Sequence, residues 1–229
     1  MTIAIGDIHG CLEPLQRLVQ RLPPQEELIF LGDIIDRGPD VRGVVSYLIH
    51  LDGLRPCRFL MGNHEEMLLK AVSNLRHTAN WLFNGGQETL KSYGLTLPSW
   101  EKAQGRGVLL GGHLGFFQEM ELYVETPDAI FVHAGVDVTL PDMAAQSRET
   151  MLWIRERFYR QGNKWRGKPI YFGHTPTNSM GLKQGMVFKS PPIYGLDTGC
   201  VYGGKLTAMN TTTGEIFQEK SEYSYLRSP

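Results

Sequence analysis

The chain has 229 residues, of which 41% are hydrophobic and 21% are charged, and its formal net charge is −1. A chain of this length can bury its own core, and its near-neutral charge gives no global reason to expect nucleic acid or a membrane as a partner. Cys11, Cys57 and Cys200 are too few for a disulfide framework. No window is apolar enough to cross a bilayer, so we expect a cytoplasmic protein.

Strands and helices alternate at the start of the chain. The apolar runs TIAI, ELIFL and CRFLM predict three buried strands, and apolar residues at helical spacing predict helices at 12–22 and 41–51. Pro23 and Pro24 end the first of these helices. The pattern predicts a βαβαβ unit, in which ligands bind beyond the carboxyl ends of the strands.

Residues at about 71–125 have a different character, being helical and aromatic with several glycines. Strands are predicted again in the runs AIFV, PIYFG, PIYG, LTAM and EIFQE. No linker composition separates two domains. We therefore expect one α/β domain over residues 1–229, with a helical insertion at about 71–125.

Polar side chains follow five of the predicted strands, each at a glycine-marked turn. They are Asp7 and His9, then Asp33, Asp36 and Arg37, then Asn63 and His64, then His133, and finally His174. Strand ends of this kind converge on one crevice in an α/β sheet. Oxygen and imidazole ligands without thiolate suit Mn²⁺, Fe or Zn²⁺. The pattern predicts a metal centre.

The motifs GDIHG, GDIIDRG, GNHE, HAG and GHT occur in this order between residues 6 and 175. Together they resemble the bacterial and phage-type phosphoprotein phosphatase family of the calcineurin-like metallophosphoesterases, over roughly residues 3–210. The resemblance implies an αββα sandwich, with two central β-sheets flanked by helices. It also implies two divalent metal ions at the edge of the sheets, with Mn²⁺ expected and Fe, Zn²⁺ or Ni²⁺ as alternatives.

The resemblance also implies a ligand set. Asp7 and His9 would hold the first metal ion, and Asp33 would bridge to the second. The ligands of the second ion would be Asn63, His133 and His174. A bridging carboxylate can hold two cations about 3.5–4 Å apart, a spacing that suits in-line displacement at phosphorus.

Three further roles follow from the same resemblance. His64 would be the general acid that protonates the leaving alkoxide, oriented by the carboxylate of Asp36. Substrate phosphate would be bound by Asn63, Arg37 and a second arginine in LWIRERF, which is Arg155 with Arg157 as the alternative. Glu65 and Glu66 are interpreted as favourable to the dipole of the helix that begins there, not as catalytic groups.

The predicted function is hydrolysis of phosphoserine or phosphothreonine monoesters, by direct attack of a hydroxide that bridges the two metals. The alternative is a bis(5'-nucleosyl)-tetraphosphatase, and the non-enzyme alternative is a metal-bound binding scaffold. Met61 precedes GNHE where the resembled protein phosphatases usually carry arginine, which leaves the dinucleoside polyphosphate alternative open. The expected partner is a phosphoprotein or a small phosphorylated molecule, with no nucleic acid and no membrane.

Aromatic residues of the insertion allow two interpretations. Trp81, Trp100, Phe116 and Phe117 could stack on a nucleobase, but packing within the insertion is favoured because aromatic side chains bury large areas. Cys11 is expected to be a small buried residue.

Overall fold

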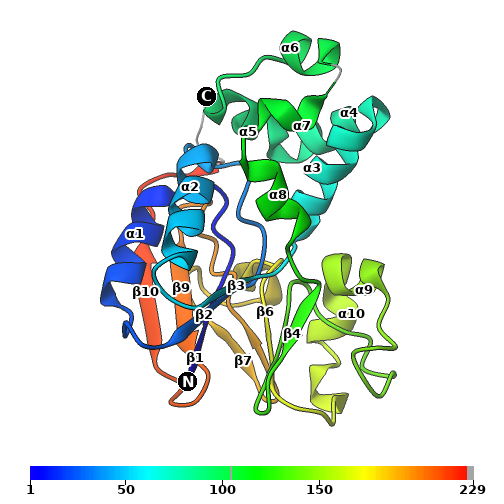
Figure 1. Cartoon of the computed structure of the whole chain (residues 1–229). Helices are drawn as coiled ribbons and strands as arrows, with labels where there is room; N and C mark the ends of the chain where they lie inside the picture. The colour runs from blue at the N-terminus through cyan, green and yellow to red at the C-terminus, as the bar shows by residue number, and fades with distance from the viewer. Residues whose placement is uncertain (104, 226–229) are drawn as a thin grey trace.

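The computed structural model describes residues 1–103 and 105–225. Two five-stranded sheets lie at its centre (Figure 1). The first sheet has the order β10-β9-β1-β2-β3, with the bounds Ile216–Lys220, Lys205–Asn210, Thr2–Ile5, Glu27–Phe30 and Cys57–Phe59. The second has the order β4-β5-β6-β8-β7, with the bounds Tyr123–Glu125, Ile130–Val132, Ile170–Phe172, Ile193–Gly195 and Phe188–Ser190.

Helices surround the two sheets. The longer ones are α1 (Leu12–Arg21), α2 (Val41–Asp52) and α3 (Asn63–Ser73). The shorter α-helices are α4 (Thr78–Trp81), α5 (Gln87–Ser92), α6 (Leu97–Lys102), α7 (Arg106–Leu109), α8 (His113–Gln118), α9 (Arg148–Trp153) and α10 (Glu156–Tyr159). Single turns of other helix types are η1 (Leu75–His77), the π-type η2 (Leu82–Gly86), η3 (Gly162–Lys164) and η4 (Thr177–Met180).

The first sheet is covered on both faces because its strands are apolar on both sides. Successive side chains of a strand point to opposite faces, so Ile3 and Ile5 of β1 share one face and Ala4 lies on the other. Ile3 and Ile5 belong to the buried cluster that contains Leu18 of α1. Ala4 belongs to a second cluster that contains Phe131 of β5, in the other sheet. The first sheet therefore lies between a helical layer and the second sheet.

The second sheet is covered in the same way. Ile130 and Val132 of β5 lie in a third buried cluster, together with Met151 of α9 and Phe158 of α10. The order of layers is helices, sheet, sheet, helices. This confirms the predicted αββα sandwich with two central sheets flanked by helices.

Two strands of the second sheet were not predicted. These are β4 and β7, which have three residues each. The side chains of Phe188–Ser190 are only partly buried or exposed, so β7 shows no apolar run, and β4 falls at the end of the segment interpreted as helical. Short strands of this kind take their structure from the neighbour with which they pair and not from a local pattern.

The segment between α3 and β4 carries the helices from η1 to α8. Trp81, Trp100 and Phe117 are completely buried there, and the rings of Trp81 and Trp100 lie 5.1 Å apart. The favoured interpretation, packing within this segment, is confirmed for these three residues. Cys11 is buried too, as expected.

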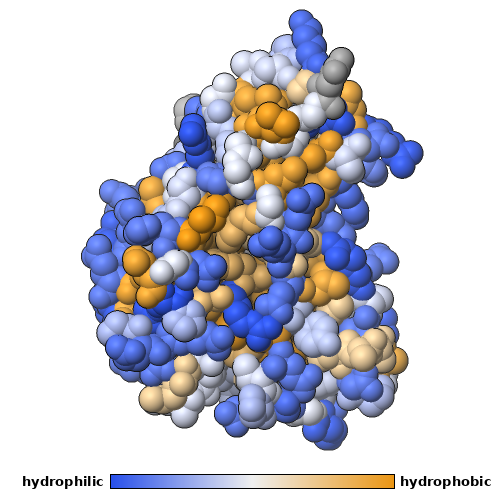
Figure 2. All heavy atoms as spheres, viewed as in Figure 1, coloured by the Kyte–Doolittle hydropathy of each residue, from blue (hydrophilic) through white to orange (hydrophobic). Residues whose placement is uncertain are grey.

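The surface carries a limited apolar region. Figure 2 shows apolar side chains gathered around α7 and α8, where Val108 is 81% exposed. Across residues 1–103 and 105–225, none of the helices has the length and apolar character needed to span a bilayer.

Candidate active site

The carboxyl ends of five strands bring the predicted site residues together. In the first sheet β1 pairs in parallel with β2 and β2 with β3, and in the second sheet β5 pairs in parallel with β6. Parallel strands end at the same edge of a sheet, so the loops that follow them deliver their side chains to one place. The segments that directly follow β1, β2, β3, β5 and β6 carry all nine polar residues that the strand-end pattern singles out; seven lie in loops, and Asn63 and His64 begin α3.

The backbone of the site is held in an unusual conformation. Among the described residues, five that are not glycine have a positive φ, and all five are predicted site residues: His9 (45°), Asp33 (49°), Asp36 (68°), Arg37 (66°) and His174 (64°). Non-glycine residues seldom adopt this region, because the Cβ atom crowds the backbone there. Such strain persists only where the surrounding structure fixes it, and it concentrates at functional sites.

Asp33 lies at the centre of the constellation. Its Oδ1 accepts a hydrogen bond from the backbone N–H of His64 at 3.1 Å and lies 3.4 Å from His133 Nε2. Its Oδ2 lies 3.6 Å from His9 Nε2. Burial alone would raise the pKa of Asp33, but the surrounding histidines, His133 first, hold it well below its ordinary value. Asp33 is therefore an anionic group that can be shared by ligands on both sides.

The buried histidines are suited to bind a metal as neutral imidazoles. Burial lowers the pKa of His9, His133 and His174. The Nδ1 atoms of His9 and His133 each lie 2.7 Å from a backbone carbonyl, that of Ile35 and that of Leu31 respectively. Donation to these carbonyls fixes the tautomer of each ring. Nε2 then carries the lone pair that a metal ion would take.

Among the residues that the structure describes, two groups of side chains could each hold a metal ion. His9, Asp33 and His64 offer ligand atoms within 4.8 Å of one another, and so do Asp33, His133 and His174. Asp33 belongs to both groups. Nε2 of His174 is buried and has no hydrogen-bond partner among the described residues, which is costly for an imidazole unless a ligand takes that position. The donor set therefore fits a pair of divalent cations that share Asp33.

Asp7 and Asn63 lie at the margins of these two groups. Both carboxylate oxygens of Asp7 accept the backbone N–H of His174, at 3.1 and 3.0 Å, and Asp7 is in neither of the two groups. Its pKa is raised well above the ordinary value, by burial and then by the charges of Asp197 and Asp33. Oδ1 of Asn63 lies 3.1 Å from His133 Nε2, on the side of the second group.

His64 belongs to the first of the two groups, although the sequence assigns it no ligand role, and it is held by Asp36. Nδ1 of His64 is 2.7 Å from Oδ2 of Asp36, and both side chains are buried. The carboxylate of Asp36 also accepts the indole N–H of Trp81 at 3.0 and 3.1 Å and the hydroxyl of Thr89 at 2.5 Å. The pair predicted from the sequence is thus in contact. Trp81 and Thr89 are additional partners that sequence reasoning missed, because they lie 45 and 53 residues beyond Asp36.

Glu65 has a role that the sequence interpretation did not include. Its Oε2 accepts the backbone N–H groups of Asp33 and Gly62 at 3.0 and 2.8 Å. Its Oε1 accepts those of Ile34 and Ile35 at 2.8 and 3.2 Å. The side chain is completely buried. Glu65 therefore fixes the loop after β2 against the start of α3, in addition to any effect on the helix dipole.

The two candidate arginines of LWIRERF differ in where they point. Nη1 of Arg155 donates to the backbone carbonyl of His174 at 3.0 Å and lies 3.3 Å from Thr175 Oγ1. Arg157 instead pairs with Asp137 at 2.8 Å on the exposed surface. Arg37 has its Nη1 2.8 Å from His9 Nε2. Arg37 and Arg155 thus both reach the site, whereas Arg157 does not contact it.

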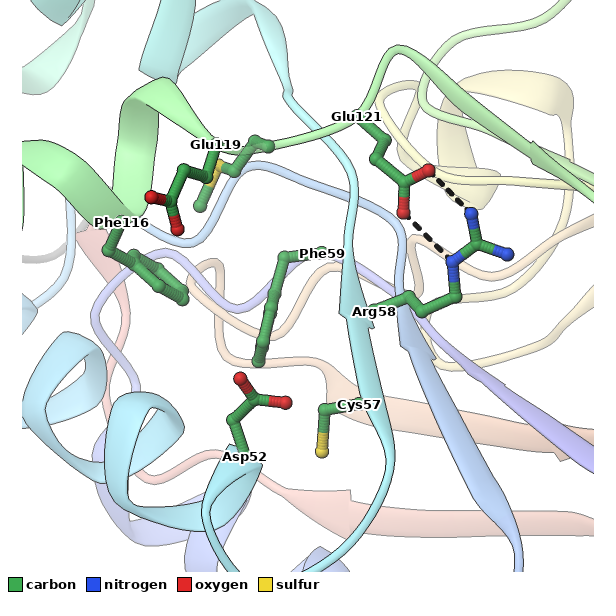
Figure 3. Close-up of a pocket in the computed structure, with 8 residues that line it drawn as sticks. Asp52, Cys57, Arg58, Phe59, Phe116, Glu119 and Glu121 are labelled. Carbon is green, nitrogen blue, oxygen red and sulfur yellow. Dashed lines mark hydrogen bonds and ion pairs between the residues drawn. The ribbon is translucent and has the colours of Figure 1, made fainter.

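A different pocket, of about 190 Å³, lies along β3 (Figure 3). Cys57, Phe59 and Phe116 contribute to its lining, and the Arg58 guanidinium forms two hydrogen bonds with the Glu121 carboxylate beside it. None of the predicted site residues lines this pocket. It gives no support to a second reaction centre.

The model of the calcineurin-like phosphoesterase family matches residues 2–178. That match spans more than half of the chain. The chain is a calcineurin-like phosphoesterase. The family resemblance carried by the five motifs is thereby confirmed, and with it a hydrolase that uses divalent metal ions.

Relatives of this phosphoesterase carry two kinds of name. Serine/threonine-protein phosphatase 1 of Salmonella typhimurium is 31% identical over 212 residues, which cover 89% of this chain and 88% of the relative. A symmetrical bis(5'-nucleosyl)-tetraphosphatase of Ralstonia nicotianae is 29% identical over 276 residues, covering 94% of this chain and 91% of the relative. The first name describes a phosphatase of proteins and the second a hydrolase of a dinucleoside tetraphosphate, so the two names differ in substrate.

Solved structures share the fold of this phosphoesterase. A protein described as a candidate diadenosine tetraphosphatase superposes with a TM-score of 0.68 at 24% identity, covering 96% of this chain and 93% of the other. A metallophosphoesterase from Sphaerobacter thermophilus superposes with a TM-score of 0.58 at 16% identity, covering 97% of this chain and 88% of the other. At these identities the likeness concerns the fold.

Proposed function

We propose that this phosphoesterase hydrolyses phosphate monoesters of the phosphoserine or phosphothreonine type. The observation that carries the proposal is the contact of Asp36 with His64, which lies in one of the two side-chain groups that share Asp33. A protein that only bound a metal would have no need of a buried imidazole paired with a carboxylate at 2.7 Å. That pair is the arrangement that proton transfer to a poor leaving group requires.

The expected ligands of the two metal ions are the six residues Asp7, His9, Asp33, Asn63, His133 and His174. When bound, two divalent ions supply Lewis acidity toward the phosphate and lower the pKa of water toward about 7. Carboxylate, amide and imidazole donors without thiolate suit Mn²⁺, Fe or Zn²⁺, and among these Mn²⁺ is the ion that the family resemblance leads us to expect. The chain fixes the donors by burial and by hydrogen bonds to their far sides.

His64 supplies the proton that the reaction consumes. Its Nδ1 is committed to Asp36, so Nε2 is the atom that faces the site, 3.9 Å from Asp33 Oδ2. Water adds to phosphorus and loses one proton to the solvent, the bond from phosphorus to the leaving oxygen breaks, and the proton from Nε2 neutralises the departing alkoxide. A proton from the solvent then restores the imidazolium. The buried anion of Asp36 stabilises the imidazolium before this transfer. No covalent phosphoenzyme is required.

Arg37 and Arg155 bind the phosphoryl oxygens. A guanidinium presents fixed N–H donors that match phosphate geometry, and these two arginines approach the ligand groups from the side of His9 and the side of His174. They hold the phosphorus in line with the attacking oxygen and the leaving oxygen. Asn63 contributes its amide beside His133.

Hydrolysis of a bis(5'-nucleosyl) tetraphosphate is the second candidate. The residue before the GNHE motif is Met61, which is buried and apolar, so this position itself brings no charge to select a doubly charged monoester. The cation beside it is Arg148, whose Nη2 lies 2.7 Å from Met61 Sδ. Phosphate anhydrides have a better leaving group than alkyl esters and would depend less on His64. Several relatives carry this activity in their names.

A substrate panel with the Mn²⁺-loaded enzyme tests the proposal. Phosphoserine and phosphothreonine peptides, an aryl phosphate and diadenosine tetraphosphate are compared by kcat/KM. Highest kcat/KM on the phosphopeptides supports the main proposal, and highest kcat/KM on diadenosine tetraphosphate supports the second candidate. Absence of turnover on every compound, with metal bound, would support a binding scaffold.

A further inference from the structure

A cleft of about 510 Å³ opens beside the candidate metal centre. Glu66 and Lys70 line it from α3, and Arg148, Glu149 and Trp153 line it from α9. The outline in Figure 2 is indented between the parts of the molecule where Figure 1 places α3 and α9. The volume falls in the range of about 300–1,000 Å³ that is typical of small-molecule sites.

The cleft adjoins the reaction centre on the side of His174. The indole ring of Trp153 lies 6.3 Å from the His174 ring, edge to face. Glu66 follows Asn63 by less than one helical turn on α3. A substrate whose phosphorus is held between Arg37 and Arg155 can therefore extend into this cleft.

Glu66 fixes the groups that line the cleft. Its buried carboxylate accepts a hydrogen bond from Arg148 Nε at 2.8 Å and from the indole N–H of Trp153 at 3.1 Å, and it pairs with Lys70 at 3.0 Å. Fixed donors lose little conformational entropy when a ligand binds. The side chains of Arg148 and Lys70 are still 47% and 53% exposed, so both cations can reach a ligand in the cleft.

Trp153 is the accessible tryptophan of the chain. It is 37% exposed, whereas Trp81 and Trp100 are completely buried and Trp165 is 4% exposed. Its orientation is set by the hydrogen bond to Glu66. An accessible indole whose orientation is fixed is suited to stack on a planar ring, and such stacking is sequence-tolerant for nucleobases.

We propose that this cleft is a nucleotide subsite, in which Trp153 stacks on the base and Arg148 and Lys70 bind a phosphate of the leaving group. The inference rests on the second candidate function, and it names where the departing nucleotide of a dinucleoside polyphosphate would lie. Glu66 and Glu149 balance the two cations, so a phosphate would be held by directed hydrogen bonds and not by a general positive field. The flank of a phosphopeptide would engage the cations without requiring the indole.

Intrinsic fluorescence tests binding without turnover. Titration of the metal-loaded enzyme with ADP should quench tryptophan emission to saturation, because Trp153 is the accessible indole. Pyrophosphate, which has the anionic charge without the base, should quench far less. The Trp153→Phe variant should lose most of the ADP-dependent change. Equal quenching by ADP and pyrophosphate, or full quenching in Trp153→Phe, would overturn the stacking assignment.

Kinetics test the subsite in turnover. Arg148→Ala and Trp153→Ala should each lower kcat/KM for diadenosine tetraphosphate, relative to an aryl phosphate, by about tenfold, mainly through KM. Arg160→Ala, an exposed arginine of the neighbouring surface that pairs with Glu156, is the matched control and should leave that ratio unchanged.

The outcomes separate this inference from the proposed function. A fall in kcat/KM for acidic phosphopeptides, with no change for diadenosine tetraphosphate, would show that the cleft binds a peptide flank and would overturn the nucleotide subsite. If the wild-type enzyme turns over none of these substrates, the proposed function fails, while quenching by ADP still reports whether the cleft binds a nucleotide.

Discussion

Substitution of Glu65 by glutamine is the sharpest test of how the site is held. Each carboxylate oxygen of Glu65 accepts two backbone N–H groups, from Asp33 and Gly62 at one oxygen and from Ile34 and Ile35 at the other. Glutamine has the same shape, but its amide nitrogen cannot accept a hydrogen bond. Whichever way the amide is oriented, two buried N–H groups lose their acceptor and face another donor.

The magnitude follows from these contacts. A buried donor that loses its acceptor costs about 1–3 kcal/mol, so two of them cost about 2–6 kcal/mol. The effect of an acidic residue in the first turn of a helix is about 0.3–1 kcal/mol. Burial and then the charge of Asp33 raise the pKa of Glu65, whereas the N–H groups of Gly62, Ile35 and Ile34 lower it because they donate to the carboxylate. The acceptor role and the helix-dipole role of Glu65 therefore predict different losses in the free energy of unfolding.

Urea unfolding of the metal-free protein at neutral pH measures the difference. Glu65→Gln should lower the free energy of unfolding by about 2–6 kcal/mol, a large share of the roughly 5–15 kcal/mol that stabilises a typical domain. Glu13→Gln is the matched control, because it removes a carboxylate from the first turn of α1, where Glu13 is 79% exposed and pairs only across the surface with Arg17. We expect the control to lose about 1 kcal/mol or less. Equal losses in the two variants would refute the acceptor role of Glu65.

The remaining predictions concern catalysis and pH. Removal of metal by a chelator should abolish activity, and about two equivalents of Mn²⁺ should restore it; full activity in protein shown to be metal-free by elemental analysis would contradict the ligand assignment. His64→Asn should lower kcat on an alkyl phosphate by about 10²–10⁴ with metal content unchanged, and a loss below about tenfold would exclude the acid role. Arg155→Ala should lower kcat/KM by about tenfold or more, whereas Arg157→Ala, which removes a surface ion pair with Asp137, should change it little. Burial opposes the ionised form of Glu66, but the donors around it hold its pKa below 4.5, so its contribution to stability is present above pH 4.5 and is lost as the pH falls further. The difference in unfolding free energy between wild type and Glu66→Gln, measured in urea, should therefore shrink below pH 4.5. A difference that stays constant would refute the lowered pKa.

The part of the fold and site that could be predicted from the sequence lies on the strand ends. Apolar runs such as those of β1 and β2 are visible locally, and the topology of parallel strands carries the residues that follow them to one edge. His9 and Asp33 could therefore be placed in one centre although they are far apart in the chain. The strand β7 could not be predicted, because its residues are stabilised by pairing with β8 and not by a pattern of their own.

Other parts of the site depend on contacts that leave no local signal. The sequence places Glu65 in the first turn of α3, where a helix-dipole role is a sufficient local explanation. Its actual acceptor role depends on a loop 30 to 32 residues earlier in the chain, which packs against that turn. Trp81 reads as a core residue and is one, but its indole N–H also holds Asp36. Trp81 thus both packs in the core and positions Asp36, and only its packing can be predicted from its residue type.

The cleft beside His174 could not be predicted from the sequence for the same reason. Glu66 meets Arg148 and Trp153 across 82 and 87 residues, because α9 packs beside α3, and no motif connects these positions in the sequence. The residues that perform the reaction sit on strand ends and could be assigned from the chain. The residues proposed to select the substrate sit on helices whose relative position is set by the packing of the two layers. Relatives that share the reaction centre and differ in substrate are therefore expected to differ at such helix contacts, and comparison of Trp153→Ala on the two substrate classes measures that separation directly.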